Sequence, residues 1–160
     1  MTNKWEEVGN FHHSTTMFIG EYTHTVDDKK RVSVPSKFKK ELGTKVVITR
    51  GLEHCLSVYP WKAWQTISAD IARLDPKQAD ARGFSRFMLA GAVEVDVDAG
   101  GRILIPEYLS EFAELGNSVV LAGIYDKVEI WEKKRWDAYK KKIESEAEGL
   151  AEKLGSVGIR

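Results

Sequence analysis

The chain contains the same pattern twice, and this internal repeat limits the folds it can adopt more than any other feature. Residues 26–35 read VDDKKRVSVP, and residues 97–106 read VDAGGRILIP. The match continues further along each copy: VVI at 46–48 aligns with VVL at 119–121, and LSVY at 56–59 with VEIW at 128–131. Apart from one inserted residue, the register holds over about fifty residues, which chance rarely produces, so the sequence predicts two copies of one small module.

Each copy begins with segments that are typical of short β-strands. Residues 21–26 and 93–97 alternate polar with apolar or β-branched side chains, the pattern of a half-buried strand. A turn containing Asp27 or Asp98 follows, because aspartate side chains accept hydrogen bonds from nearby backbone N–H groups. A second short strand, at 31–34 or 102–105, then ends at a proline, which cannot donate to a β-ladder.

Helices are predicted after these prolines and at the end of each copy. Proline is tolerated in the first turn of a helix, so a short helix should follow Pro35 and Pro106. Gly43 and Gly116 are the expected helix ends, since glycine readily adopts the left-handed conformation. Two further strands and an amphipathic helix complete each copy.

A four-stranded sheet of this size buries too little surface to be stable alone. The two modules are therefore expected to interlock into one pseudo-symmetric β-barrel, in a mainly β protein with flanking helices (α+β). The linker between them should be helical, with a break near Asp75 and Pro76. The predicted organisation is a disordered leader or tag (1–16), a first module (17–64), a helical linker (65–92), a second module (93–136), and a C-terminal amphipathic helix and tail (137–160).

The composition argues against several classes of function. The chain has 24 basic and 24 acidic residues, so nucleic acid could be attracted only by a local patch. Its single cysteine, Cys55, excludes an intrachain disulfide and fits a reducing cytoplasm. Glu53, His54 and Cys55 lack the second cluster that a zinc site needs, and no phosphate-binding loop or catalytic motif is found. We expect no enzyme activity, metal, cofactor, small-molecule ligand or membrane segment.

The two copies differ in charge where they agree in pattern. Residues 27–40 hold six basic and two acidic side chains, whereas the matching residues 98–111 hold one basic and three acidic ones. Only the first window attracts phosphate, so we expect the first module to contact DNA and the second mainly to complete the barrel and the oligomer. The basic residues of the first window are Lys29, Lys30, Arg31, Lys37, Lys39 and Lys40.

Arg31 is the candidate reader of sequence. The arginine fork can span O6 and N7 of a guanine, whereas Lys29 and Lys30 would neutralise phosphates without reading bases. The residues alone leave a second interpretation open, in which Asp27 and Arg31 are only a turn with a local ion pair. For Asp98 and Arg102, in acidic surroundings, this structural interpretation is favoured. The helix residues Lys37 and Lys39 rank below the turn as DNA contacts.

The sequence resembles the MraZ family in two places. The run MFIGEY at 17–22, followed by His24 and by Asp27-x-x-x-Arg31, is similar to the family's opening, and Asp98-x-x-x-Arg102 resembles its second signature. The resemblance spans residues 17–143 and implies a tandem AbrB-like, swapped-hairpin barrel that assembles into rings. It also implies a repressor that binds repeated boxes upstream of the division and cell-wall gene cluster, in the cytoplasm and associated with the nucleoid.

Two positions depart from that family's pattern. Lys30 stands where the family usually has glycine, so a positive φ there would cost about 1 kcal/mol. Lys39 stands where arginine is usual, which would replace a bidentate contact by a point charge.

The expected partners are double-stranded DNA and further copies of the chain. An antitoxin-like or protein-interaction barrel that holds a partner chain is the alternative, because fold does not decide between these functions. An apolar stripe on the last helix keeps this alternative open, with docking on a neighbouring subunit as one possibility. Its members are Trp136, Tyr139, Ile143, Ala147, Leu150 and Leu154.

Overall fold

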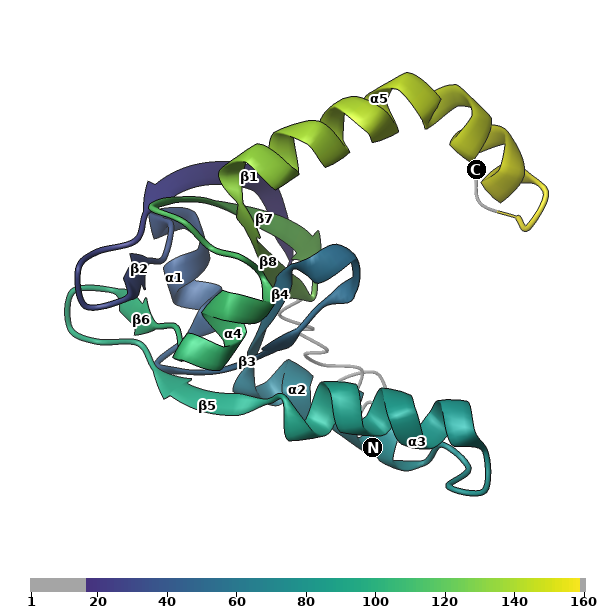
Figure 1. The fold of residues 1–160 in the computed structure, drawn as a ribbon, viewed down its shortest axis with the longest axis horizontal. Helices are drawn as coiled ribbons and strands as arrows, with labels where there is room; N and C mark the ends of the chain where they lie inside the picture. The colour runs from purple at the N-terminus through teal and green to yellow at the C-terminus, as the bar shows by residue number, and fades with distance from the viewer. Residues whose placement is uncertain (1–16, 159–160) are drawn as a thin grey trace, which may run out of the picture.

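The computed structural model describes residues 17–158, so the predicted leader at 1–16 lies outside the described residues. The first module contains β1 (Phe18–Thr25), β2 (Arg31–Ser33), α1 (Ser36–Leu42), β3 (Lys45–Arg50), β4 (Leu56–Pro60) and α2 (Trp61–Ala72). The second repeats this order with β5 (Val93–Asp96), β6 (Arg102–Leu104), α4 (Glu107–Phe112), β7 (Ser118–Tyr125), β8 (Lys127–Glu132) and α5 (Lys133–Gly155). The prediction of a duplicated mixed α+β module is therefore confirmed (Figure 1).

The modules interlock by exchanging strands. A six-stranded sheet has the order β1-β7-β8-β4-β3-β5, so the first strand of each module pairs antiparallel with a strand of the other. A separate two-stranded ribbon pairs β2 with β6. The strand pairings leave β1 and β5 at the two ends of the sheet, with the ribbon apart from it, instead of forming one closed ring of strands.

The strand registers are symmetric about a pseudo-twofold axis. In the ribbon, Val32 pairs with Ile103. The residue before each of them pairs with the residue after the other. In the sheet, Ser57 pairs with Glu129 in the same symmetric way, between β4 and β8. Both of these central pairs join positions that are equivalent in the sequence repeat. The repeat of the sequence is thus a symmetry of the fold.

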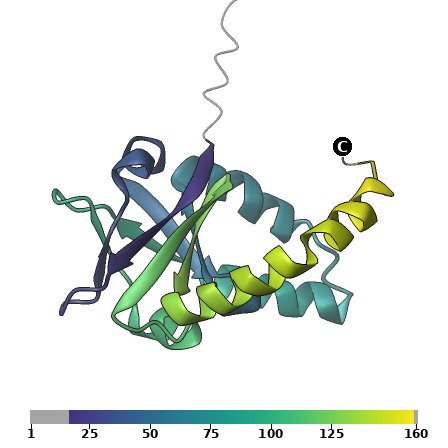
Figure 2. The same cartoon turned by 90° about the horizontal axis from the view of Figure 1, so that it is seen from above.

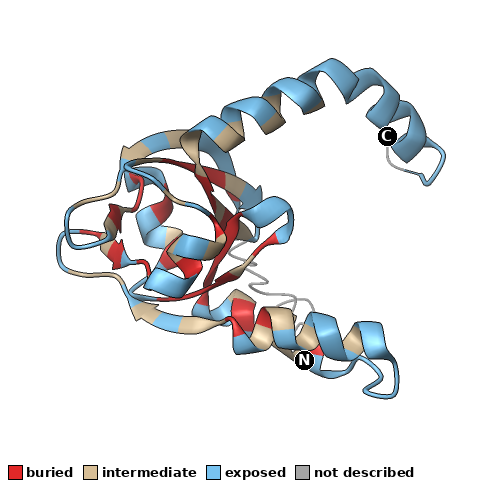
Figure 3. Cartoon of the chain, viewed as in Figure 1, coloured by how far each residue is buried: buried red, intermediate tan, exposed pale blue. Residues whose placement is uncertain are grey.

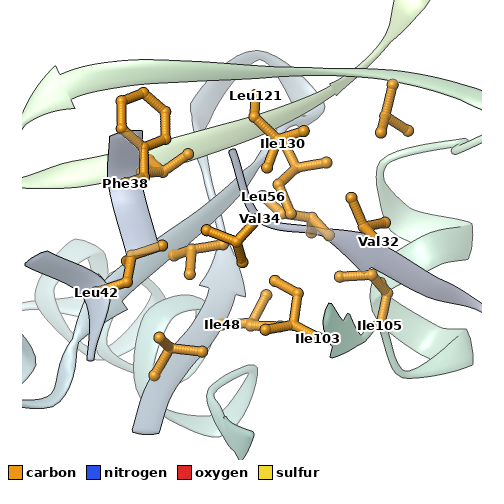
Figure 4. Close-up of a cluster of buried hydrophobic side chains, with 14 of the residues drawn as sticks. Val32, Val34, Phe38, Leu42, Ile48, Leu56, Ile103, Ile105, Leu121 and Ile130 are labelled. Carbon is orange, nitrogen blue, oxygen red and sulfur yellow. The ribbon is translucent and has the colours of Figure 1, made fainter. Parts of the chain in front are cut away.

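One core lies between the sheet and the ribbon and draws on both modules. Its fully buried side chains include Val32 and Ile48 from the first copy, and Ile103 and Leu121 from the second (Figure 4). Because each module supplies half of this apolar surface, neither can bury its own share without the other. At the edge, Gly123 has no room for a Cβ against the backbone of Phe18 and Ile19, which fixes the close approach of β1.

The linker is helical, as predicted, and is interrupted where the sequence places Asp75 and Pro76. The segments after α2 are α3 (Ala79–Ser85) and a π-helical turn (Arg86–Ala90), labelled η2, and a short 3-10 turn (Leu52–His54), labelled η1, joins β3 to β4. The π-helical turn is held to β3 by Thr49, whose hydroxyl donates to the Met88 carbonyl at 2.6 Å. A second buried cluster beneath it contains Val47, Tyr59, Trp64, Ile71 and Met88.

The two short helices end differently. Gly43 follows α1 with a φ of 73°, as predicted. The prediction that the equivalent helix continues to Gly116 is wrong, because α4 ends at Phe112 and the left-handed residue is Glu114, with a φ of 51°. The backbone N–H of Leu115 donates to the carbonyl of Ser110 at 3.0 Å, which closes the end of α4 around Glu114 before the chain reaches the glycine.

The C-terminal helix α5 begins at Lys133, before the predicted 137, and extends away from the body. Only its first turns lie on the sheet, while the remainder projects alone (Figures 1 and 2). None of the helices within residues 17–158 is both long and apolar enough to span a membrane.

Candidate nucleic-acid interface

The first turn is built around the carboxylate of Asp27. Its Oδ1 accepts hydrogen bonds from the backbone N–H groups of Lys29 and Arg31, each at 2.9 Å. Its Oδ2 accepts a third, at 2.8 Å, from Nε of the Arg31 side chain. The backbone N–H of Arg31, followed by its guanidinium, stabilises the ionised form and lowers the pKa of Asp27 below its usual 3.8.

The second turn repeats this geometry. Asp98 Oδ1 accepts from the backbone of Gly100 and Arg102 at 2.9 Å, and its Oδ2 accepts from Arg102 Nε at 3.1 Å. The same causes, led by the Arg102 backbone N–H, lower the pKa of Asp98. Both Asp-x-x-x-Arg pairs therefore have a structural role within the turn, and the equal geometry shows that this role does not depend on the surrounding charge.

The two turns are joined at their bases. Arg31 Nη1 lies 3.9 Å from Asp98 Oδ2, so the arginine of the first turn stands between both aspartates. The Val34 N–H donates to the carbonyl of Gly101 at 2.8 Å, and the Ile105 N–H donates to that of Lys30 at 3.0 Å. Both loops project from the same end of the molecule in Figures 1 and 2. In the sequence the two turns are separate surfaces, and the fold joins them into one.

Lys30 occupies the strained position that the sequence suggested. Its φ is 61°, and the equivalent Gly101 has a φ of 75°, so both copies of the turn need a left-handed residue there. A lysine in this conformation costs about 1 kcal/mol relative to a relaxed backbone. The Lys30 side chain is exposed, at the edge of a groove that is also lined by Glu107 and Glu111 of α4 and by Glu114 just after it.

The lysines of α1 border the second turn. Lys37, Lys39 and Lys40 are exposed, and the end of the Lys39 side chain occupies the space that a Cβ on Gly101 would need. Strand exchange thus places a first-module lysine against the second-module turn. The turn surface, defined as residues 27–31 and 98–102 with Lys37, Lys39 and Lys40, is basic along α1 and acidic along α4.

Exposure separates the lysines from the arginines. The five lysines at 29, 30, 37, 39 and 40 are exposed, and within residues 17–158 none of them forms an ion pair. The Arg31 side chain keeps 26% of its surface exposed and that of Arg102 keeps 37%. The burial of Arg31 and the closeness of the acidic α4 to Lys30 both result from the pairing of strands between the two modules. A sequence alignment of the two copies carries no signal for either.

Cys55 and its neighbours form no comparable site. The thiol is fully buried and donates to the Leu52 carbonyl at 3.2 Å, and burial raises its pKa. The His54 ring stacks on Phe112, with ring centres 5.2 Å apart. Across the described part of the chain, no three His, Cys, Asp or Glu side chains are grouped as metal ligands.

Comparison with known proteins gives one consistent result. Residues 17–87 and 88–155 each match the family model described as "MraZ protein, putative antitoxin-like". A relative from Moorella thermoacetica is 46% identical over 138 residues, covering 86% of this chain and 96% of the relative. One from Caldanaerobacter subterraneus subsp. tengcongensis is 46% identical over 143 residues (89% and 100%), and one from Acetivibrio thermocellus is 45% identical over 143 residues (89% and 100%). All three relatives carry the name "Transcriptional regulator MraZ".

Proposed function

The chain belongs to the MraZ family, and from this premise we propose that it is a transcriptional regulator that binds promoter DNA through its turn surface. We further propose that it represses the division and cell-wall gene cluster, by binding repeated promoter boxes as a homo-oligomer in the cytoplasm. Catalysis is not part of this function.

One observation carries the proposal. Five exposed lysines that form no ion pair within residues 17–158 surround two rigid turns at one end of the molecule. Neutralising phosphates and releasing counterions supplies most of the affinity of proteins for DNA, and exposed lysines provide that charge. A rigid loop between them loses little entropy when it binds.

Within this surface the residues have distinct roles. Lys29, Lys30, Lys37 and Lys39 contact phosphates and set the position of the duplex, which carries no sequence information. Arg31 reads a base. Its hydrogen bond to Asp27 uses Nε, and Nη1 lies 3.9 Å from Asp98, which is beyond hydrogen-bonding distance. Both terminal nitrogens therefore keep their hydrogen bonds for O6 and N7 of guanine. The acidic groove beside Lys30 repels phosphate, so the duplex lies on the α1 side of the turns.

Repetition of the site explains how a small surface gives a useful affinity. One turn surface makes few contacts, but several on one oligomer would meet several boxes on one promoter. The second and later contacts are then intramolecular, and their effective concentration is high. Asp98 and Arg102 keep the second turn in shape and hold the neighbouring Arg31 in place.

Binding of a protein partner is the second candidate function. It is supported by the exposed apolar side chains on α5, of which Leu150 is 39% and Leu154 is 49% exposed. This function would not need the lysines of the turn surface.

A mobility-shift titration on the DNA upstream of the protein's own gene, at two salt concentrations, tests the proposal. Arg31→Ala should weaken binding about 10- to 100-fold, because one bidentate base contact is worth about 1–3 kcal/mol. Arg102→Ala is the matched control, since it removes the same bond from an equivalent turn. Melting temperatures should fall equally in both variants. Equal binding by wild type and Arg31→Ala would remove Arg31 from the mechanism, and a larger loss in Arg102→Ala would reverse the roles of the turns.

A further inference from the structure

The helix α5 is held firmly at its start and left alone afterwards. The Glu132 side chain caps it by accepting from the Arg135 backbone N–H at 2.8 Å. Glu21 of β1 accepts from the Trp136 ring nitrogen at 3.1 Å and forms an ion pair with Lys140. Every residue from 144 to 158 is exposed, and Figure 3 shows this part of the helix in pale blue. The chain therefore carries about three helical turns on which every residue is exposed.

These turns carry an apolar stripe with the spacing of a coiled coil. Ile143, Ala147, Leu150 and Leu154 follow one another at intervals of four, three and four residues, and Val157 follows in the turn just after α5. This is the spacing that keeps apolar side chains on one seam between two helices. The end of the stripe is its most exposed part, with Leu154 at 49% and Val157 at 71%. An isolated apolar seam of this regularity favours a second helix as its partner.

The charges beside the seam select the direction of that partner. Glu146 and Lys153 lie one heptad apart, on the same flank of the stripe. In an antiparallel pair of identical helices, this flank faces itself in reverse order, so Glu146 of each copy meets Lys153 of the other. The same register places Ile143 opposite Leu154 and Ala147 opposite Leu150, which gives four apolar layers. In a parallel pair Glu146 would face Ala151, and no opposite charges would meet.

The position of α5 on the body also favours an antiparallel pair. Because α5 projects from one side, an antiparallel pair would leave the two bodies at opposite ends (Figures 1 and 2). A parallel pair would bring the bodies side by side within the width of two helices. The overlap from Ile143 to Leu154 spans about 16 Å of helix, and this length makes each contact weak and reversible.

We propose that residues 143–154 of α5 pair antiparallel with the same segment of a second copy of the chain. Ile143, Ala147, Leu150 and Leu154 form the seam, and Glu146 and Lys153 set its direction. The contact joins two bodies without covering the turn surface, so it does not rest on the proposed DNA binding.

Disulfide trapping with two variants that each add one cysteine tests the direction. Ile143→Cys and Leu154→Cys are purified separately, mixed, and oxidised under mild conditions. The antiparallel pair predicts a disulfide dimer in the mixture and none in either variant alone, because like positions lie about 16 Å apart. The wild type is the control, since Cys55 is fully buried. A dimer of Ile143→Cys with itself would indicate a parallel pair and overturn the proposal, as would the absence of any dimer.

Charge exchange tests the pairing without cysteine. In sedimentation experiments Glu146→Lys and Lys153→Glu should each raise the dissociation constant several-fold, and the double variant Glu146→Lys/Lys153→Glu should restore it. Glu148→Lys, which lies off the seam, is the matched control and should change little. A double variant that associates no better than the single ones would overturn the proposal.

Discussion

The two Asp-x-x-x-Arg turns have the same backbone and opposite surroundings. Asp27 and Asp98 accept equivalent sets of hydrogen bonds, and residues 30 and 101 share a left-handed backbone. The first turn nevertheless carries two exposed lysines where the second carries two glycines. Hydrogen bonding fixes the shape of both turns, while charge is free to differ. The comparison separates what keeps the turn folded from what can attract DNA.

The largest effect should come from giving the first turn the sequence of the second. Asp28→Ala/Lys29→Gly/Lys30→Gly produces a turn that already folds in the second module. The variant loses two phosphate contacts on each turn surface that binds DNA. The slope of the logarithm of the binding constant against the logarithm of the salt concentration should therefore become shallower by about 1.8 per turn surface. Affinity at low salt should fall about 10- to 100-fold.

Titration of promoter DNA at several salt concentrations measures this loss, and a melting curve confirms that the fold is intact. An unchanged salt dependence would show that charge at the first turn has no part in binding.

Substitutions at the left-handed position of the two turns should change the stability of the protein in opposite directions. Lys30→Gly relieves a left-handed lysine and should stabilise the protein by up to about 1 kcal/mol. Gly101→Ala introduces the same strain and should destabilise it by about 1–2 kcal/mol, with the Lys39 side chain also displaced. Denaturant unfolding of the two variants measures both changes. If Gly101→Ala were neutral, the left-handed requirement at this position would be wrong.

Acid should affect the two turns alike. Both aspartates have a pKa below the usual 3.8 in the folded state, so each stabilises the fold above that pH. This stability is lost as the pH falls below about 3.8 and the carboxylates take up protons. Asp27→Asn and Asp98→Asn should each flatten the dependence of the melting temperature on pH between 5 and 3, by similar amounts. A flattening in only one variant would contradict the equivalence of the turns.

The sequence predicts local structure well at positions where the residue type has a strong conformational preference. The repeat gives the order of the elements. It also aligns Lys30 with Gly101, and a glycine at this position indicates that both turns need a left-handed residue there. Gly43 ends its helix as predicted, but Gly116 does not, because Glu114 adopts the left-handed conformation and ends α4 earlier.

The candidate site can be predicted only in part from the sequence. The basic residues are visible in the chain, but an alignment of the copies cannot tell whether β1 pairs within its own module or with β7. That exchange places Arg31 near Asp98, Lys39 over Gly101, and Lys30 beside the acidic side of α4. The assignment of DNA contact to the first module alone stays a prediction, now set within a surface to which both modules contribute.

Tethered cleavage of DNA tests the central claim most directly. An iron chelate attached to Asp28→Cys, Ala99→Cys or Gly149→Cys cuts nearby DNA, and the buried native thiol of Cys55 stays unlabelled. The two turn positions should cut the promoter within the repeated boxes, and the position on α5 should cut weakly or not at all. Intact binding with no cutting from either turn would contradict the account.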